Sequence, residues 1–355
     1  MNMYDLPVEG ASVSPVGSGH INKTFRIELA DGSAALLQRI NTLVFTKPVE
    51  LMENVVAVTD FLRKKLGPGH EDEVLHVRFT TDGQSFCRDD AGGYWRIYDF
   101  VPDAFSYDAI EHPDQFRDAG EAFGNFQRLL ADFPIETLHE TIERFHDTGM
   151  RLEQLNTAAR ENRAGRLDTC RAELDFALNN RVFTTCITGG IAVGSVPLRV
   201  THNDTKLNNI MFDAKTKRPK CVVDLDTVMP GSALYDFGDA IRFGASTAAE
   251  DERDLDKVHF SMELYEAFAR GFLTACAGSL NRTEAELLAT SAIVMTLECG
   301  MRFLADHLNG DVYFGAAYPG HNLDRCRTQF KLVAEQKEHL DEMHALTMAL
   351  YNEYR

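Results

Sequence analysis

The stretch that decides the fold is a polar loop between two short apolar runs. Residues 200–212 read Val-Thr-His-Asn-Asp-Thr-Lys-Leu-Asn-Asn-Ile-Met-Phe, which places Asp204 and Asn209 five residues apart. A further apolar run, residues 221–223, ends in Asp224 and Asp226. Because a polar, turn-like segment separates them, residues 210–212 and 221–223 are expected to pair as a hairpin. That pairing would bring Asn209 beside Asp224.

This set of side chains suits phosphoryl transfer. The reaction needs a carboxylate that orients or deprotonates the attacking hydroxyl, and hard oxygen ligands for Mg²⁺ on the nucleotide phosphates. We expect Asp204 to take the first role and Asn209 and Asp224 the second, with Asp226 as a further ligand or a substrate contact. Asp and Asn are also common in loops because they cap turns. The ordered pair of motifs is much rarer than either motif alone.

The residues before position 102 are rich in strand signals. Residues 24–29 alternate in polarity, and Asp31-Gly32 is a hairpin signal that leads into a second strand over 34–40. A helix is predicted over 49–66, ended by Gly67-Pro68-Gly69. Further strands are predicted over 74–79 and 94–101.

The chain after Pro102 is mainly helical in pattern. Long amphipathic segments lie near 114–131, 149–180, 258–277, 283–308 and 323–353. Residues 283–286 have the form of a capping box, and Asn309-Gly310 ends that helix. We therefore predict an N-terminal nucleotide-binding lobe over 1–101 and a C-terminal catalytic and substrate-binding lobe over 102–355.

Composition excludes several classes of partner. The formal net charge of −18 argues against nucleic acid and anionic membrane surfaces, which need clustered Lys and Arg. The seven cysteines are scattered without a C-x-x-C pair, so neither a disulfide framework nor a zinc site is expected. No membrane helix or targeting segment is apparent. We expect a cytoplasmic monomer that acts on a small molecule.

The two motifs together resemble the aminoglycoside phosphotransferase and choline kinase family. Its loop typically reads H-G-D-x-x-x-x-N and its metal strand I-D-x-E or I-D-x-D; here they stand at 202–209 and 223–226. The resemblance implies an α+β, bilobal protein-kinase-like fold, with a small antiparallel β lobe and a larger, mainly helical lobe. ATP and Mg²⁺ would be the cofactors. It also implies structural roles for Asp236, which would buttress the loop, and for His202, which would pack within it.

Within this family, the amino-acid sequence is most similar to those of the kinases of N-acetylhexosamines. The matching runs lie at 19–22, 201–209, 224–231, 236–246 and 298–306. This resemblance implies phosphorylation of the C1 hydroxyl of N-acetylglucosamine and N-acetylgalactosamine. The implied sugar contacts, besides Asp204, are His20, Phe243, Arg302 and Tyr313. Glu298, Arg302 and Asp306 also have the i, i+4 spacing of an ordinary salt-bridge ladder on a helix.

Two groups of residues are candidates for the nucleotide site. Gly17, Ser18 and Gly19 form a loop whose backbone N–H groups can approach phosphate oxygens, although the same residues suit an ordinary hairpin. The connector residues Tyr98, Phe100 and Val101 lie where the resemblance places adenine contacts.

Gln38 stands where the third strand of a kinase normally carries Lys or Arg, and Arg39 would point to the opposite face. Glu50 and Glu53 both remain candidates for the partner carboxylate on the following helix. The residue that holds the α phosphate is left unassigned.

Two alternatives remain open from the sequence. In the first, the same fold serves another alcohol, such as choline, ethanolamine, homoserine or an aminoglycoside. A cationic acceptor needs an acidic or aromatic cage, but the single tryptophan, Trp95, lies in the predicted small lobe. The missing lysine also suggests a non-catalytic, nucleotide-binding protein, against which the retention of Asp204, Asn209 and Asp224 argues.

Overall fold

The computed structural model describes residues 3–7, 9–16 and 21–355. The chain divides into two compact units. The first comprises Met1–Ser106, Leu129–Glu143 and Asn209–Pro230, and the second comprises Tyr107–Arg128, Arg144–Asn208 and Gly231–Arg355. The polar loop therefore contributes Asp204 to the second unit and Asn209 to the first.

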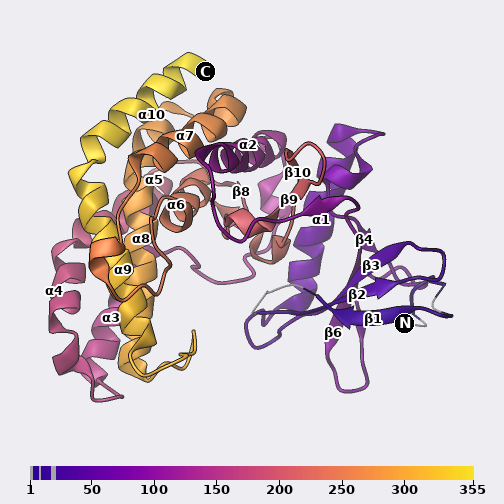
Figure 1. Ribbon diagram of the computed structural model, residues 1–355, viewed down its shortest axis with the longest axis horizontal. Coiled ribbons are helices and arrows are strands. Elements are labelled where there is room, and N and C mark those ends of the chain that lie inside the picture. The colour runs from indigo at the N-terminus through magenta and orange to yellow at the C-terminus, as the bar shows by residue number, and fades with distance from the viewer. Residues whose placement is uncertain (1–2, 8, 17–20) are drawn as a thin grey trace. The chain divides into compact units, whose positions relative to one another are not determined.

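The first unit is built on an antiparallel sheet with strand order β1-β2-β3-β6-β4, and β5 pairs with β6 (Figure 1). The hairpin predicted at Asp31-Gly32 is confirmed, because β2 and β3 pair on either side of it. One sheet face covers a small apolar cluster that includes Ile27, Ala35 and Ile97. The strands are β1 (Ser12–Pro15), β2 (Lys23–Glu28), β3 (Ala34–Arg39), β4 (Val77–Arg78), β5 (Cys87–Arg88) and β6 (Tyr94–Asp99).

Helix α1 (Pro48–Leu66) follows β3 in the chain. It begins with Pro48 in its first turn, where the missing N–H costs no helical hydrogen bond, and ends at Gly67, whose φ is 80°. The same unit contains a three-stranded sheet of order β10-β9-β7. Its strands are β7 (Ala104–Phe105), β9 (Ile210–Asp213) and β10 (Pro219–Val222). The pairing of β9 with β10 confirms the hairpin expected between the two motifs.

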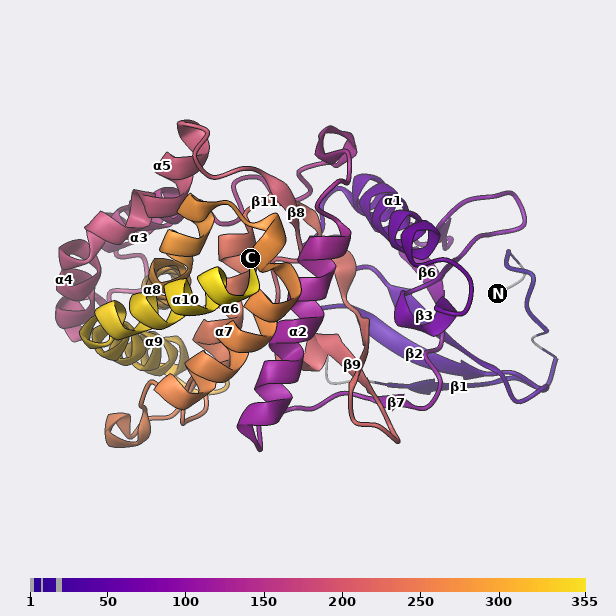
Figure 2. The ribbon, with the colours of Figure 1, turned by 90° about the horizontal axis from the view of Figure 1, so that it is seen from above.

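The second unit is mainly helical and is organised around α8 (Arg282–Asn309), which contacts α3, α6, α9 and α10 (Figure 2). Gly300 lets α9 pack closely, because a Cβ there would lie 2.5 Å from the Phe330 ring. The remaining elements of this unit are α2 (Pro113–Leu129), α3 (Thr148–Glu161), α4 (Arg171–Asn179), α5 (Cys186–Ala192), β8 (Arg199–Thr201), α6 (Ala233–Gly244), α7 (Met262–Cys276), α9 (His321–Glu338) and α10 (Leu340–Tyr354). Strand β11 (Met229–Gly231) spans the point at which the chain passes from the first unit to the second.

Helix α8 is long and apolar enough to cross a membrane, and no other helix among the described residues passes that test. However, 78% of its most apolar window is buried within the protein. Its buried side chains join α3 and α9 in one apolar cluster that contains Leu155, Leu297 and Phe330. The apolar character of α8 therefore reflects its place in the core.

Three sequence-based expectations in this unit were wrong in detail. The segment 149–180 is broken by Asn162, which has a φ of 43°, so that α3 and α4 are separate helices. The segment 323–353 is broken at His339 into α9 and α10. The capping box of α8 is formed by Asn281 and Glu284 rather than by residues 283–286, because Asn281 occupies the N-cap and has the same spacing to an acidic residue.

His307, near the end of α8, makes the stability of this unit depend on pH. Its side chain is only 4% exposed, and neither ring nitrogen has a hydrogen-bond partner among the described residues. Burial, assisted by the charge of Arg166, lowers the pKa of His307. Because the unfolded chain then binds the proton more readily, stability is expected to fall as the pH drops through about 6.5.

Replacing His307 with Phe should remove this component. We expect the urea-unfolding free energy of the parent, measured relative to that of His307→Phe, to be lower at pH 5.5 than at pH 7.5, because only the parent must keep the imidazole neutral. The exposed His344 supplies the control variant His344→Gln. A difference that does not change between these two pH values would contradict the prediction.

Candidate active site

The loop of the second unit that carries Asp204 is held by the first turn of α6. The Asp236 carboxylate accepts hydrogen bonds from the backbone N–H groups of His202 at 3.0 Å and Asn203 at 2.8 Å. The side-chain amide of Gln127 donates to the same carboxylate at 2.7 Å. Asp239, one turn later, accepts a bond from the Thr205 N–H at 3.2 Å. Two buried carboxylates of α6 thus fix the backbone on both sides of Asp204.

Asn203 is the residue of the loop that departs from the H-G-D pattern. It occupies the position at which the family typically has Gly, and its φ is 63°. This left-handed conformation favours Gly, but Asn adopts it more readily than most other residues. The preceding His202 is fully buried and packs edge-on against Phe123 and Phe126, with ring centroids 5.5 and 5.9 Å away. His202 therefore lies in the packed interior of the loop.

Asp204 forms an ion pair with Lys206, two residues further along the loop. The lysine nitrogen lies 2.7 Å from a carboxylate oxygen, and the two side chains are 35% and 26% exposed. Burial is the largest single cause and would lower the pKa of Lys206, but the charge of Asp204, its hydrogen bond and the charge of Asp239 together outweigh burial, so that the net shift is upward. Lys206 is therefore a cation at neutral pH. No role was predicted for Lys206 from the sequence, although its position two residues after Asp204 was a usable signal.

The metal-ligand candidates of the first unit meet at one end of the β9–β10 hairpin. Val222 pairs with Ile210, and the Val223 N–H donates to the Asn209 carbonyl at 2.9 Å. Asp224 follows with a φ of 59°, and its side chain is exposed. Carboxylate and amide oxygens are suitable ligands for a hard divalent cation. No group of three or more His, Cys, Asp or Glu side chains suited to a metal occurs in the described part of the chain.

Asp226 has a different environment from Asp224. Its carboxylate is buried and lies 2.5 Å from a guanidinium nitrogen of Arg96, while its other oxygen accepts a 2.6 Å bond from Asn22. The sequence analysis did not select Arg96. The signal was a charged residue placed between Tyr94 and Tyr98 on one face of a predicted strand.

The nucleotide-binding candidates also lie in the first unit. The Gln38 side chain accepts bonds from Arg96 at 2.8 and 3.1 Å and donates to Thr24 at 3.0 Å. Tyr98 is buried on β6, and the partly buried Phe100 and Val101 follow that strand. Gly17, Ser18, Gly19 and His20 lie outside the described residues.

Helix α1 does not offer a carboxylate to β3. Glu50 pairs with Lys47 at 3.2 Å, and Glu53 pairs with His139 at 2.8 Å. The side chain of α1 that reaches Arg96 is Met52, whose sulfur lies 3.6 Å from a guanidinium nitrogen. The described residues therefore contain no lysine–glutamate pair between β3 and α1.

The acceptor candidates on α8 do not form a salt-bridge ladder. Glu298 is bonded to His146 at 2.9 Å and to Thr148 at 2.6 Å. Asp306 accepts bonds from the backbone N–H groups of residues 312–314 at 2.8 to 2.9 Å. Each carboxylate thus holds a segment outside the helix, and Arg302 stands between them.

Arg302 lies against three aromatic rings. Its guanidinium carbon is 5.6 Å from the centroid of Phe145, 5.9 Å from Tyr313 and 5.3 Å from Phe314. Among the described residues it has no hydrogen-bond or ion-pair partner within the usual distance limits. The aromatic rings thus orient the Arg302 guanidinium group, and its N–H donors make no hydrogen bond to the described residues. Phe243 is partly buried on α6.

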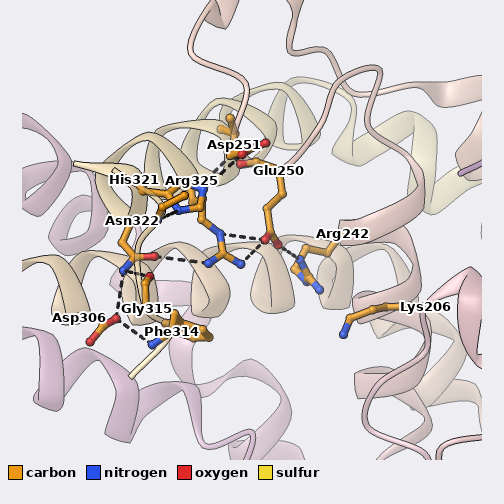
Figure 3. Close-up of polar contacts among 12 residues, drawn as sticks. Lys206, Arg242, Glu250, Asp251, Asp306, Phe314, Gly315, His321, Asn322 and Arg325 are labelled. Atoms are coloured by element: carbon orange, nitrogen blue, oxygen red, sulfur yellow. Dashed lines mark hydrogen bonds and ion pairs between the residues drawn. The ribbon is translucent and has the colours of Figure 1, made fainter. Parts of the chain in front are cut away.

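A chain of polar contacts continues from α6 to the loop that carries Tyr313 (Figure 3). Glu250 lies 2.9 Å from Arg242 and 2.5 Å from Arg325. Burial raises the pKa of Glu250, but the two guanidinium groups outweigh this and lower it overall. Asn322 then donates to Asp306 at 3.1 Å and to the Gly315 carbonyl at 3.0 Å. These contacts fix residues 311–315 against α8 and α9.

A small antiparallel sheet with one helix, a larger helical unit and the braced Asp204 loop together define a protein-kinase-like, α+β phosphotransferase fold. The chain belongs to the phosphotransferase enzyme family, whose model matches residues 12–275.

Three solved structures have the same fold. A microcompartment-associated aminopropanol kinase is 15% identical, with a TM-score of 0.60 and 96% of each chain covered. A choline kinase from Cryptosporidium parvum is also 15% identical, with a TM-score of 0.59 and 98% of this chain and 95% of that chain covered. An amicoumacin kinase in complex with AMP-PNP and Ca²⁺ is 13% identical, with a TM-score of 0.56 and coverage of 96% and 90%.

Proposed function

We propose that this protein is an ATP- and Mg²⁺-dependent kinase that phosphorylates the C1 hydroxyl of N-acetylglucosamine and N-acetylgalactosamine. The products would be the hexosamine 1-phosphates and ADP. The proposal of the sugar rests on the resemblance of the runs quoted above to bifidobacterial N-acetylhexosamine 1-kinase. The proposal of a kinase rests on the family and on the Asp204 loop. The acidic composition disfavours nucleic acid and anionic membranes as partners. A cytoplasmic monomer remains part of the proposal.

The observation that carries the chemistry is the braced Asp204–Lys206 pair. Asp204 would orient the attacking hydroxyl and accept its proton. Lys206, held as a cation beside it, would compensate negative charge near the reacting groups. Because the loop backbone is fixed by Asp236 and Asp239, little reorganisation would be needed during the reaction.

The proposed cofactors are supported by the ligand chemistry of the first unit and by a structural neighbour. The amicoumacin kinase of this fold binds a non-hydrolysable ATP analogue together with a divalent cation. Asn209 and Asp224 would hold Mg²⁺ here. When bound, Mg²⁺ would neutralise charge on the phosphates. Residues 17–19, Gln38, Tyr98, Phe100 and Val101 remain the proposed surroundings of the nucleotide.

The unused donors of Arg302 support a neutral acceptor rich in oxygen atoms. Sugar hydroxyls and an acetamido carbonyl accept hydrogen bonds, and a planar guanidinium can donate to two of them at once. Burial and then the charge of Arg302 lower the pKa of Arg151, so the two cations lie in mutual electrostatic range. His20, Phe243 and Tyr313 would complete the sugar site.

A second candidate is a kinase of a small amino alcohol. Two of the structural neighbours are named as an aminopropanol kinase and a choline kinase, and the net charge of −18 would suit a cationic substrate. The presence of Arg302 and Arg151 near one another argues against a cationic acceptor, because like charges repel in a partly buried site.

An acceptor screen with ADP release as the readout tests the proposal. N-acetylglucosamine and N-acetylgalactosamine should give acceptor-dependent ADP, whereas choline, ethanolamine, homoserine and kanamycin should not. In Arg302→Lys, kcat/KM for the sugar should fall by about 10-fold or more while KM for ATP is unchanged, since lysine keeps the charge but loses the planar donors.

The exposed Arg160 supplies the matched control Arg160→Lys. A response to choline or kanamycin alone would disprove the sugar specificity while leaving the kinase proposal intact. No turnover with any acceptor would instead favour a non-catalytic, nucleotide-binding protein.

A further inference from the structure

The first unit contains an arginine that is almost completely buried. Arg96, on β6, is 1% exposed and stands directly opposite Gln38 on β3. Its guanidinium group donates twice to the Gln38 carbonyl oxygen and lies 5.0 Å from the centroid of the Tyr98 ring. Burial lowers the pKa of Arg96, but the charge of Asp226 leads the opposing causes and the net shift is upward. The side chain is therefore charged in the interior.

The partner of this charge is the second carboxylate of the Asp224-Leu225-Asp226 sequence. The Arg96–Asp226 contact of 2.5 Å joins side chains that are 1% and 3% exposed. The Asn22 side-chain NH₂ group donates to the remaining oxygen of Asp226 at 2.6 Å, and the Asn22 side-chain oxygen in turn accepts a bond from the Asn41 N–H. Both oxygens of Asp226 thus have partners from the N-terminal sheet region of the same unit.

The turn itself separates the two carboxylates. Asp224 has a left-handed backbone conformation and an exposed side chain, whereas Leu225 and Asp226 begin a short 3₁₀ turn and are buried. A metal at Asp224 could recruit Asp226 only by breaking an ion pair in the interior. Separating a buried pair leaves an uncompensated charge, which is strongly unfavourable. The ion pair therefore disfavours Asp226, but not Asp224, as a metal ligand.

We propose that Arg96 is a positioning residue that withdraws Asp226 from the metal-ligand set and fixes the turn so that Asp224 alone presents a carboxylate to the metal. This proposal rests on the proposed function. Kinases normally carry a cation on the third strand, where this chain has Gln38. In the proposal, the buried cation of the first unit is instead Arg96 on β6. The role of Asp226 becomes that of an anchor for the turn.

Binding of Mn²⁺, followed by electron paramagnetic resonance in the presence of AMP-PNP, tests the proposal without turnover. Asp224→Asn should weaken Mn²⁺ binding by about 10-fold or more, because a metal-bound carboxylate is lost. Asp226→Asn should change it by less than about 3-fold. The double variant Arg96→Gln/Asp226→Asn should also retain Mn²⁺ binding. Because it leaves neither charge in the interior, it can be used if the single variant Asp226→Asn fails to fold.

Thermal unfolding supplies a second readout. The loss of Tm in the double variant should be smaller than the sum of the losses in Arg96→Gln and Asp226→Asn, since each single change isolates a buried charge. Arg96→Lys should recover part of the Tm lost in Arg96→Gln.

Two outcomes of the Mn²⁺ titration would overturn the proposal. In the first, Asp226→Asn weakens binding as much as Asp224→Asn does. In the second, neither substitution changes binding. Failure of the proposed function would appear separately, as an absence of ADP release with sugar acceptors in a parent protein that still binds Mn²⁺ and nucleotide.

Discussion

Replacing Asp204 with Asn is expected to lower kcat by about a thousandfold while leaving the affinity for AMP-PNP and Mg²⁺ nearly unchanged. The amide can still accept a hydrogen bond from Lys206, so the loop should keep its shape, but it cannot take the proton of the attacking hydroxyl. Positioned proton transfer contributes about 10²- to 10⁴-fold in enzymes. Steady-state kinetics and calorimetric titration of the nucleotide measure the two quantities.

The matched control is Asp168→Asn. Asp168 also pairs with a neighbouring cation, Arg171, but its side chain is 86% exposed. This control should have parental kcat and parental nucleotide affinity. Retention of full activity by Asp204→Asn would remove Asp204 from the mechanism. A parallel loss of nucleotide affinity would show that the substitution had disturbed more than the proton acceptor.

Replacing Asp236 with Asn is expected to destabilise the second unit and to reduce kcat together. The buried carboxylate accepts from three N–H donors, and an amide NH₂ group in its place would face at least one of them. Leaving a buried donor or acceptor without its partner costs about 1 to 3 kcal/mol. Urea unfolding and kcat at a temperature below the transition measure these effects.

Asp254 provides the comparison for this substitution. It also accepts a backbone N–H bond at the start of a short turn, from Asp256, but its side chain is 52% exposed. Asp254→Asn should therefore change the unfolding free energy only slightly. If Asp236→Asn were as stable as the parent but inactive, the carboxylate would have a direct role in the reaction rather than a supporting one.

The sequence was sufficient for the fold class and for the hairpin that joins the two polar motifs. The hairpin between residues 210–212 and 221–223 followed from strand patterns and a polar turn, which are local signals. The contacts of Arg96 were not predictable in the same way, because Gln38 and Asp226 lie far from it in the chain and meet it only through sheet register and burial.

The helix α8 illustrates the same limit. Spacing placed Glu298, Arg302 and Asp306 on one face, but spacing alone cannot tell whether a carboxylate pairs within its helix or with another segment. Here Glu298 reaches His146, and Asp306 reaches the backbone N–H groups after the helix. Tertiary contacts to segments outside the helix took precedence over the weak i, i+4 attraction.

The attachment of residues 312–314 to Asp306 has a consequence for how acceptor preference can diverge. Asp306 binds only main-chain N–H groups of this segment, so these hydrogen bonds do not depend on the side chains of residues 312–314. Val312 and Tyr313 are 77% and 63% exposed, whereas α8 lies in the core. With Tyr313 as the proposed acceptor contact, a new acceptor preference would be gained by exchanging exposed residues of this segment, while the sequence of α8 stays the same.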